Sequence, residues 1–296
     1  MDEELLAVRV AQLYYEQDKT QDEIGAQLGI SRFKAGRMLS QARERGIVRI
    51  EVVHPRARLA PLERQLRDRF GLTDAVIVRD DVPQAAADYL AELRPRTLGV
   101  SWGRTLDAIA ERLAIGFASG VTVVQINGAM SASRRTEITA TIAQRGGGTS
   151  VLLPSPAILE RLETKRAIEA DRTVADVLAK AATASAYLYS AGVADESSVL
   201  VESGYLTPAD VTELVRRGAV GDVVGRYIDS AGNIVDAELD ARTVGLGLDQ
   251  LRSAKTAIFA VAGAAKHDVA RAIVTNGLCT VLVSDESTAR ALLEEK

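Results

Sequence analysis

Apolar and polar positions near the N-terminus repeat at the spacing of two short helices. After Thr20, the residues Ile24, Gly25 and Leu28 form one apolar stripe, and Thr20 with Glu23 has the spacing of a capping box. Gly29 suits the left-handed position that ends a helix. The pattern therefore predicts a short capped helix followed by a tight turn.

A second amphipathic helix is predicted directly after this turn. Ile30 is expected to fill the corner and Ser31 to cap the helix, which ends near Gly46. The positions expected to face inward are Ala35, Met38, Leu39 and Ala42. The opposite side presents Arg32, Phe33, Gly36, Arg37 and Ser40, with Lys34 at its flank. Residues 47–53, IVRIEVV, then alternate like a strand and could form a wing.

Two helices joined by a tight turn are the geometry that lays the second helix in the major groove of DNA. Residues 31–58 hold eight Lys or Arg and two acidic residues, whereas residues 1–58 hold ten basic and nine acidic ones. The basic character is thus confined to the predicted DNA face, which favours DNA binding over a helix pair that merely packs within the protein. Arg32 and Arg37 are candidates for guanine edges, and Lys34, Arg43 and Arg45 for phosphates. The predicted DNA-binding residues are Ser31, Arg32, Phe33, Lys34, Arg37, Ser40 and Arg43.

A joint is predicted between His54 and Gly71, where Pro55 and Pro61 interrupt the chain. A helical stripe follows, made of Leu59, Leu62, Leu66 and Phe70. Such a stripe either packs into a core or forms a dimerising linker helix, and both interpretations stay open. The predicted organisation is a helix-turn-helix domain over residues 1–54, a linker helix over residues 55–71 and a larger domain over residues 72–296.

From residue 73 onward, apolar strand-like runs alternate with helical patterns, which is typical of a mostly parallel α/β sheet flanked by helices. The predicted strands are residues 75–78, 97–100, 121–126, 150–154, 186–192, 257–263 and 279–284. The predicted helices are residues 105–117, 135–144, 173–184, 208–217, 267–276 and 287–295.

In such sheets, ligands bind where strands end and helices begin. Three junctions carry suitable residues: residues 99–105 with Ser101, Gly103 and Thr105, residues 127–131, and residues 263–271 with Lys266. Free backbone amides at a helix N-terminus can bind an anion, and Arg104 adds a positive charge. The short polar segment 218–229 adds Asp222, which could accept hydrogen bonds from the hydroxyl groups of a sugar. Each loop alone is more typical of an ordinary strand-to-helix turn, but together they make a phosphorylated small ligand an equally good interpretation.

Composition narrows the class of protein. The chain has 296 residues, 47% of them hydrophobic, which is enough to build one small and one larger domain. Its net charge is −4. The only cysteine, Cys279, lies in an apolar run, excludes a disulfide within the chain and fits a reducing compartment. The acidic N-terminus carries no secretion signal and no apolar run is long enough to span a membrane, so a cytoplasmic protein is expected.

The ordered set of motifs resembles the SorC family of bacterial sugar-responsive transcriptional regulators over nearly the full length. The segments that carry the resemblance are TQDEIGAQLGISRFKAGRMLSQARERGIVRI, LGVSWGRTL and the run from GDVVGRYID to the C-terminus. The resemblance implies a winged helix-turn-helix and an effector domain similar to glucosamine-6-phosphate deaminase and ribose-5-phosphate isomerase. It further implies a sugar effector, often phosphorylated, that controls binding to double-stranded operator DNA, and a dimer or tetramer. No cofactor, metal or membrane partner is implied.

The resemblance also implies which residues contact the effector. Residues Ser101, Trp102, Gly103, Arg104 and Thr105 match the phosphate loop, Asp222 an acidic contact, Lys266 a lysine near the ligand, and Gly128 with Ala129 a second ligand loop. Gly25 and Ala35 replace the usual alanine and valine, which predicts a slightly looser helix seam. Trp102 and Arg104 make the first loop bulky, so a ligand without phosphate stays open, with Trp102 either stacking on a sugar or packing in the core.

An enzyme of sugar-phosphate isomerisation or deamination with a DNA-binding appendage is the alternative. Isomerisation needs a base beside the reacting carbon, often with a histidine that opens the sugar ring. The two histidines are His54, beside the linker prolines, and His267, which with Asp268 is expected to be a charge pair at a helix end. Lys266 could form a Schiff base, but pairing with phosphate or hydroxyl groups is expected. The sequence has no metal-ligand spacing of Cys and His, and we expect a non-enzymatic regulator.

Overall fold

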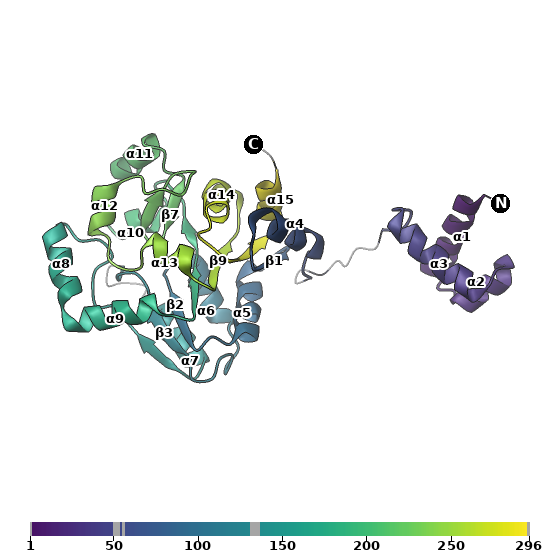
Figure 1. Ribbon diagram of the computed structural model, residues 1–296, viewed down its shortest axis with the longest axis horizontal. Helices are drawn as coiled ribbons and strands as arrows, with labels where there is room; N and C mark the ends of the chain where they lie inside the picture. The colour runs from purple at the N-terminus through teal and green to yellow at the C-terminus, as the bar shows by residue number, and fades with distance from the viewer. Residues whose placement is uncertain (1, 50–53, 55–56, 131–136, 295–296) are drawn as a thin grey trace. The chain divides into compact units, whose positions relative to one another are not determined.

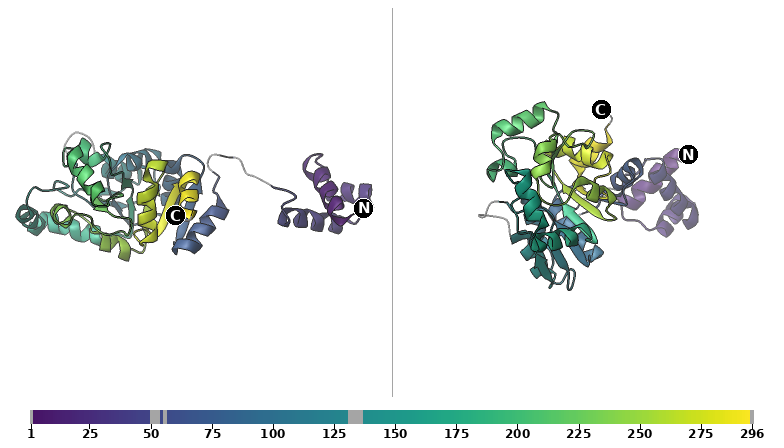
Figure 2. Two further views of the ribbon diagram at one scale, coloured as in Figure 1. Left: turned by 90° about the horizontal axis from the view of Figure 1, so that it is seen from above. Right: turned by 60° about the vertical axis from the view of Figure 1, so that its left-hand side comes forward.

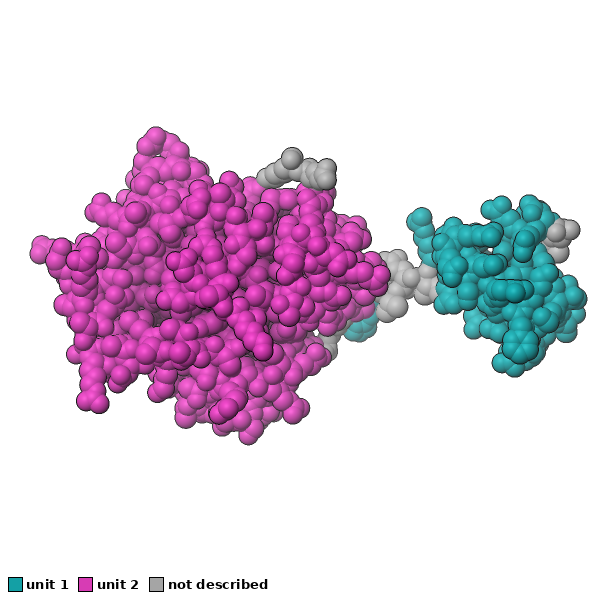
Figure 3. All heavy atoms as spheres, viewed as in Figure 1, with its two compact units in different colours: residues 1–54 teal, residues 55–296 magenta. Residues whose placement is uncertain are grey.

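The computed structural model describes residues 2–49, 54, 57–130 and 137–294. The chain divides into two compact units, Met1–His54 and Pro55–Lys296, which Figure 3 draws in different colours. Each unit has its own hydrophobic core, so each is described by itself.

The first unit consists of three helices, α1 (Glu3–Tyr15), α2 (Gln21–Leu28) and α3 (Arg32–Glu44). The capping box of α2 is confirmed: Glu23 N–H donates to Thr20 Oγ1 at 3.3 Å, and Thr20 N–H donates to the Glu23 carboxylate at 2.8 Å. Gly29 adopts the left-handed conformation that ends α2, and Ser31 Oγ accepts from Lys34 N–H at 3.2 Å. The predicted inward positions of α3 are buried against α1 and α2, namely Ala35, Met38, Leu39 and Ala42.

This unit differs from the sequence expectations at Gly25 and in the segment after α3. A Cβ atom at Gly25 would lie 2.7 Å from the Ile30 carbonyl oxygen, so glycine here allows a close approach of the backbone. The expectation of a looser seam is therefore wrong at Gly25. Of the predicted wing strand, residues 47 and 48 form a bend after α3, residue 49 is in no regular element, and residues 50–53 lie outside the described residues.

The stripe at the joint belongs to the core of the second unit. It lies on α4 (Ala60–Phe70) and its N-cap residue Leu59. Leu66 is fully buried, and Leu59, Leu62 and Phe70 are partly buried in the same cluster. Helix α4 packs against the first strand of the sheet and the last helix of the chain. Within this unit, the core interpretation of the stripe is the one that the packing supports.

The second unit is built on a seven-stranded sheet in which every pair of neighbouring strands is parallel. The strand order is β1-β10-β9-β5-β2-β3-β4, and the mostly parallel α/β class is confirmed. The strands are β1 (Asp74–Val78), β2 (Thr97–Val100), β3 (Thr122–Gln125), β4 (Thr149–Val151), β5 (Ala186–Tyr189), β9 (Ala257–Val261) and β10 (Val281–Asp285).

Helices cover both faces of this sheet (Figures 1 and 2). Alternate residues of β1 point to opposite sides, with Ala75 and Ile77 in one core cluster and Val76 and Val78 in the other. One face is covered by α5 (Val82–Leu93), α6 (Arg104–Arg112) and α7 (Glu137–Arg145). The other is covered by α4, α9 (Arg172–Ala182), α13 (Leu248–Ser253), α14 (His267–Thr275) and α15 (Glu286–Leu293). Burial on both faces explains why the strands are nearly continuous apolar runs.

A small antiparallel sheet adds β6 (Ala191–Gly192), β7 (Gly221–Val223) and β8 (Arg226–Ile228), in the order β6-β7-β8. The single strand predicted over residues 186–192 is therefore wrong, because the chain leaves the large sheet after Tyr189 to pair with β7. In the segment described as polar, residues 221–228 are all buried, and Asp222 and Arg226 are its buried charged side chains. The remaining helices are α8 (Leu162–Ala170), α10 (Val199–Glu202), α11 (Pro208–Arg216), α12 (Ala237–Arg242) and the 3-10 turn η1 (Ala264–Lys266).

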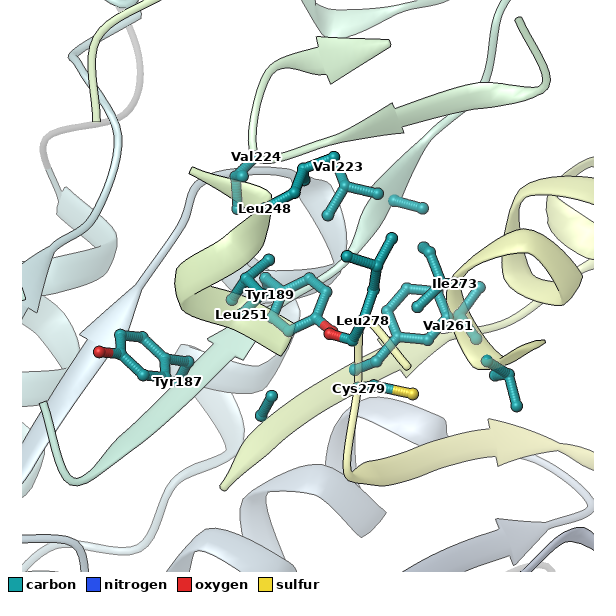
Figure 4. Packing of buried hydrophobic residues seen from close by; sticks show 14 of the residues in the cluster. Tyr187, Tyr189, Val223, Val224, Leu248, Leu251, Val261, Ile273, Leu278 and Cys279 are labelled. Carbon is teal, nitrogen blue, oxygen red and sulfur yellow. The ribbon is translucent and has the colours of Figure 1, made fainter. Parts of the chain in front are cut away.

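The core of the sheet's second face is shown in Figure 4. Tyr189 stacks on Phe259 with ring centroids 5.6 Å apart, and its hydroxyl donates to the Leu278 carbonyl. Cys279 is buried there as predicted, and burial raises the pKa of its thiol to about 12. This thiol therefore acts as a small hydrophobic side chain.

Candidate ligand-binding site

A cavity of about 320 Å³ lies at the carboxyl ends of β2, β5 and β9. Strand β5 lies between β9 and β2 in the sheet. The chain after β2 enters α6 on one face, whereas the chain after β9 enters α14 on the other face. Such a divergence of connections opens a crevice at the carboxyl edge of a parallel sheet. The lining includes Ser101–Thr105, residues 190–193, Asp222 and residues 262–266.

The loop after β2 presents a helix N-terminus to the cavity. Gly103, with a φ of +135°, precedes α6, and among the described residues no side chain caps this helix start with a hydrogen bond. Because the first amides of a helix have no partner within it, they are available to an anion. Ser101 lies buried beside them, and its own N–H donates to the Leu188 carbonyl at 3.1 Å.

Trp102 has a fixed place in the wall of the cavity. Its Nε1–H donates to the Gly128 carbonyl at 3.1 Å, and its half-buried ring packs against two hydrophobic clusters. The ring therefore packs in the core and lines the cavity at the same time.

Arg104 supplies a positive charge near the cavity mouth. Its side chain is 63% exposed, lies 3.7 Å from the Glu202 carboxylate and donates to the Ser197 carbonyl at 3.3 Å. An exposed ion pair of this kind contributes little energy, so the guanidinium is free to change partners.

The loop after β9 presents a second glycine-led turn. Gly263 has a φ of +95° and begins η1, and its carbonyl accepts from Lys266 N–H at 3.0 Å. The Lys266 ammonium lies 3.5 Å from Ser190 Oγ at the end of β5. The order β9-β5-β2 thus brings Lys266 and the β2 loop to the same cavity.

Asp222 reaches the cavity from the small sheet. It pairs with Gly192 across β6 and β7, and a Cβ atom at Gly192 would lie 1.8 Å from the carboxylate, so only glycine leaves room for it. The carboxylate accepts from Gly225 N–H at 3.0 Å. Val224 and Gly225 form the turn of the β7–β8 hairpin with positive φ values of +48° and +85°. The left-handed conformation is costly for a β-branched residue, and it places Val224 in the cavity wall.

The buried charges of the cavity perturb one another. Burial raises the pKa of Asp222 to about 6, although the Gly225 N–H and the Lys266 charge oppose this rise. Burial also lowers the pKa of Lys266, a shift that Asp222 opposes and Arg104 reinforces. Perturbed groups of opposite sign in one cavity are typical of a functional site.

The structure brings together most of the effector residues predicted from the sequence. Ser101, Trp102, Gly103, Arg104, Thr105, Asp222 and Lys266 all line the cavity. Gly128 and Ala129 do not line it, because both pack against residues 155–157: Ala129 N–H donates to the Ser155 carbonyl, and a Cβ atom at Gly128 would lie 2.2 Å from the Pro156 oxygen.

Other lining residues were not predicted, among them Ser190, Gly192, Asp195, Ser197 and Ser198. They lie in and after the segment that leaves β5. The rule that ligands bind at strand ends, applied to the predicted strand ending at residue 192, could have identified Asp195, Ser197 and Ser198, whereas Ser190 and Gly192 lie inside that predicted strand.

The first unit presents a separate polar surface. On α3, Ser31, Arg32, Phe33, Arg37 and Arg43 are exposed, and Lys34 and Ser40 are partly exposed. Phe33 is 87% exposed. Arg32 lies 3.4 Å from the Asp22 carboxylate of α2, in an exposed pair that contributes little.

Neither histidine is among the described residues that line the cavity. His267 Nε2 lies 3.5 Å from Ser287 Oγ instead. Within the described residues, no group of three or more His, Cys, Asp or Glu side chains is arranged to hold a metal ion. The same part of the chain has no helix of the length and apolar character that crossing a membrane requires.

Comparison with known proteins agrees with this geometry. Residues 54–294 match the family model described as "Putative sugar-binding domain". The deoxyribonucleoside regulator of Bacillus subtilis (strain 168) is 31% identical, over 99% of each chain. The sorbitol operon regulator of Klebsiella pneumoniae is 29% identical, also over 99% of each chain. The crystal structure of the full-length sorbitol operon regulator SorC from Klebsiella pneumoniae covers 99% of this chain and 100% of its own, with a TM-score of 0.72 and 27% identity.

A small helical unit joined to a parallel α/β unit with a polar cavity at its carboxyl edge is thus the architecture of a sugar-binding transcriptional regulator. The chain belongs to the SorC family of such regulators. It is a DNA-binding regulator controlled by a sugar-type effector, and the enzyme alternative is not favoured by its relatives, which are named as regulators.

Proposed function

We propose that the 320 Å³ cavity binds a sugar phosphate and that its occupancy changes the affinity of the α2–α3 unit for an operator. The observation that carries the proposal is the sheet order β9-β5-β2, which brings Lys266, the uncapped N-terminus of α6 and Asp222 to one cavity. The helix N-terminus, Arg104 and Lys266 suit a phosphate group. Asp222 suits the hydroxyl groups of the sugar, because a carboxylate accepts hydrogen bonds from them.

On the DNA side, α3 is proposed to enter the major groove. Arg32 and Arg37 would contact guanine edges, and Lys34 and Arg43 would contact phosphates, with Ser31, Phe33 and Ser40 beside them. One reading head contacts too few base pairs for specificity, so the protein would act in the cytoplasm as a dimer or tetramer.

Control follows from linkage between the two sites. An effector that binds one arrangement of the large units better than another shifts the population toward that arrangement. A coupling of about 1–3 kcal/mol changes operator affinity about 5- to 150-fold, which is sufficient for regulation. No chemical turnover is required for this control, and the protein is proposed to be non-enzymatic.

The test is a thermal-shift screen of the full chain against pairs of sugars with and without phosphate, such as ribose and ribose 5-phosphate. A ligand at about 100 times its Kd stabilises the native state by about 2.7 kcal/mol, which gives a clear rise in melting temperature. Lys266→Ala should reduce this rise, whereas Lys180→Ala, on the exposed end of α9, should leave it unchanged.

Each sugar phosphate that stabilises the chain is then added to the operator complex in a mobility-shift assay. A change in operator affinity is expected. If no sugar or sugar phosphate stabilises the chain, the proposed ligand class is wrong, and if the stabilising compound is chemically converted, the enzyme alternative returns.

A further inference from the structure

The carboxylate of Asp285 touches two elements with different roles. Its Oδ2 accepts from the Gly263 N–H of the cavity loop at 3.0 Å. Its Oδ1 accepts from Thr288 N–H at 2.7 Å and thereby caps α15. One side chain therefore links the loop that carries Lys266 to the start of the last helix.

The loop side of this link reaches the cavity directly. Gly263 donates its N–H to Asp285, and its carbonyl accepts from Lys266 N–H in the turn η1. A second contact lies alongside, where His267 Nε2 is 3.5 Å from Ser287 Oγ in the first turn of α15. Any displacement of the Gly263–Lys266 turn by a ligand would therefore act on the N-terminus of α15.

The helix side of the link reaches the chain that leads to the DNA-binding unit. Helix α15 packs against α4, with Leu292 and Leu66 in one core cluster. The Arg69 guanidinium of α4 donates to the Leu293 carbonyl of α15 at 2.5 Å. Helix α4 is the first helix after the DNA-binding unit along the chain.

The start of α4 is in turn tied to the edge of the sheet. The Glu63 carboxylate, only 4% exposed, accepts from Ile77 N–H of β1 at 3.0 Å and from Arg58 Nε at 2.9 Å. Arg58 also donates to the Ala75 carbonyl at 3.0 Å, and Leu59 N–H donates to the Ile77 carbonyl at 2.8 Å. The chain from Arg58 to Glu63, which leads into α4, is thus hydrogen-bonded to β1.

We infer that Asp285 is a positioning residue that couples the cavity to α4 through α15. The inference rests on the proposed function of the cavity and names the route by which its occupancy is passed on. The physical basis is a continuous series of hydrogen bonds and packed side chains, from Lys266 through Gly263, Asp285 and α15 to α4.

The test uses Asp285→Asn in the full chain. Asparagine and aspartate cap helices about equally, so α15 keeps its cap. The amide group of the asparagine, however, presents N–H donors where Asp285 Oδ2 now accepts. Asp285→Ser should behave in the same way, since serine also caps but has a single oxygen. The matched control is Asp171→Asn. Asp171 caps α9 by accepting from Thr173 N–H at 2.9 Å, and its replacement removes the same charge from a helix cap.

Hydrogen–deuterium exchange without any sugar gives the first measurement. In both Asp285 variants we expect about tenfold faster exchange over residues 263–267 and about threefold faster exchange over residues 57–70, at an unchanged melting temperature. Asp171→Asn should change neither segment. Faster exchange confined to residues 263–267, or no change at all, would show that Asp285 does not act beyond its own contacts.

A double-mutant comparison gives the second measurement, which a purely capping role would not alter. Lys266→Ala should change exchange over residues 57–70 in the wild-type background and leave it unchanged when Asp285→Asn is already present. Equal effects of Lys266→Ala in both backgrounds, or none in the wild type, would overturn the inference. Because no sugar is used, this result is independent of the ligand screen, so failure of the proposed function and failure of the coupling route can be told apart.

Discussion

The buried carboxylate of Asp222 costs stability, and its replacement tests whether the cavity is built for binding. Asp222 is 5% exposed, and its carboxylate accepts from Gly225 N–H at 3.0 Å. Asp222→Asn keeps the shape of the side chain and an oxygen for Gly225, but it removes the buried charge. We expect this variant to be more stable than the wild type and to bind the effector more weakly.

The magnitude follows from the pKa of Asp222. The ordinary pKa of this carboxyl is 3.8, and burial raises it to about 6 in the folded chain. Between these values the folded chain binds the proton more tightly than the unfolded chain, so the free energy of unfolding falls as the pH rises through this window. Above about pH 6 the loss is complete and amounts to about 3 kcal/mol, at about 1.4 kcal/mol for each pKa unit.

Asp222→Asn should therefore gain up to about 3 kcal/mol at about pH 8 and nothing below about pH 4. Trp102 is the only tryptophan and lies in the larger unit, so its fluorescence follows the unfolding of that unit in urea. The difference between variant and wild type is compared across pH, because other carboxyl groups contribute equally to both. Asp249→Asn serves as the control, since the Asp249 side chain is 95% exposed.

Equal or lower stability of Asp222→Asn at about pH 8 would refute the argument from burial. A gain in stability that is the same at low and high pH would also refute this argument, because such a gain would arise from packing and not from the buried charge. A gain in stability accompanied by loss of the sugar-induced thermal shift would show that the cost of burying Asp222 serves ligand binding.

Two further predictions concern the reading head and the centre of the sheet. Arg37→Ala should remove about 1–3 kcal/mol of discrimination between the operator and a scrambled duplex. Competition in a mobility-shift assay measures this, with Arg9→Ala of α1 as the control. Unchanged discrimination would contradict the placement of α3 in the groove. Gly99→Ala should lower the free energy of unfolding by about 1–3 kcal/mol in urea, since its Cβ atom would lie 2.7 Å from both Ile126 Cγ2 and Tyr187 Cδ1. Wild-type stability of this variant would mean that the centre of the sheet tolerates a wider spacing.

Several elements could be predicted because their signals are local. The caps at Thr20 and Ser31 depend on residues three positions away, and the predicted inward face of α3 is the buried face. The apolar runs at residues 75–78 and 97–100 correspond to β1 and β2, because parallel strands buried on both faces are apolar throughout. Helix α5 was not predicted. Its Pro83 stands in the first turn, where proline starts a helix, but the same residue also suits a loop.

The sequence alone thus determined the two helices and tight turn with their basic face, the approximate positions of the strands of the large sheet, and the glycine loops at residues 103 and 263. It did not determine which of these loops face one another. Gly128 and Ala129 have the same loop chemistry as the cavity loops, yet they pack behind Trp102. Asp222 enters the cavity only because the chain leaves the large sheet after Tyr189 and pairs Gly192 with β7. Helix caps and periodicity act over a few residues, whereas strand order depends on packing between segments that lie far apart in the chain, and only the tertiary structure decides it.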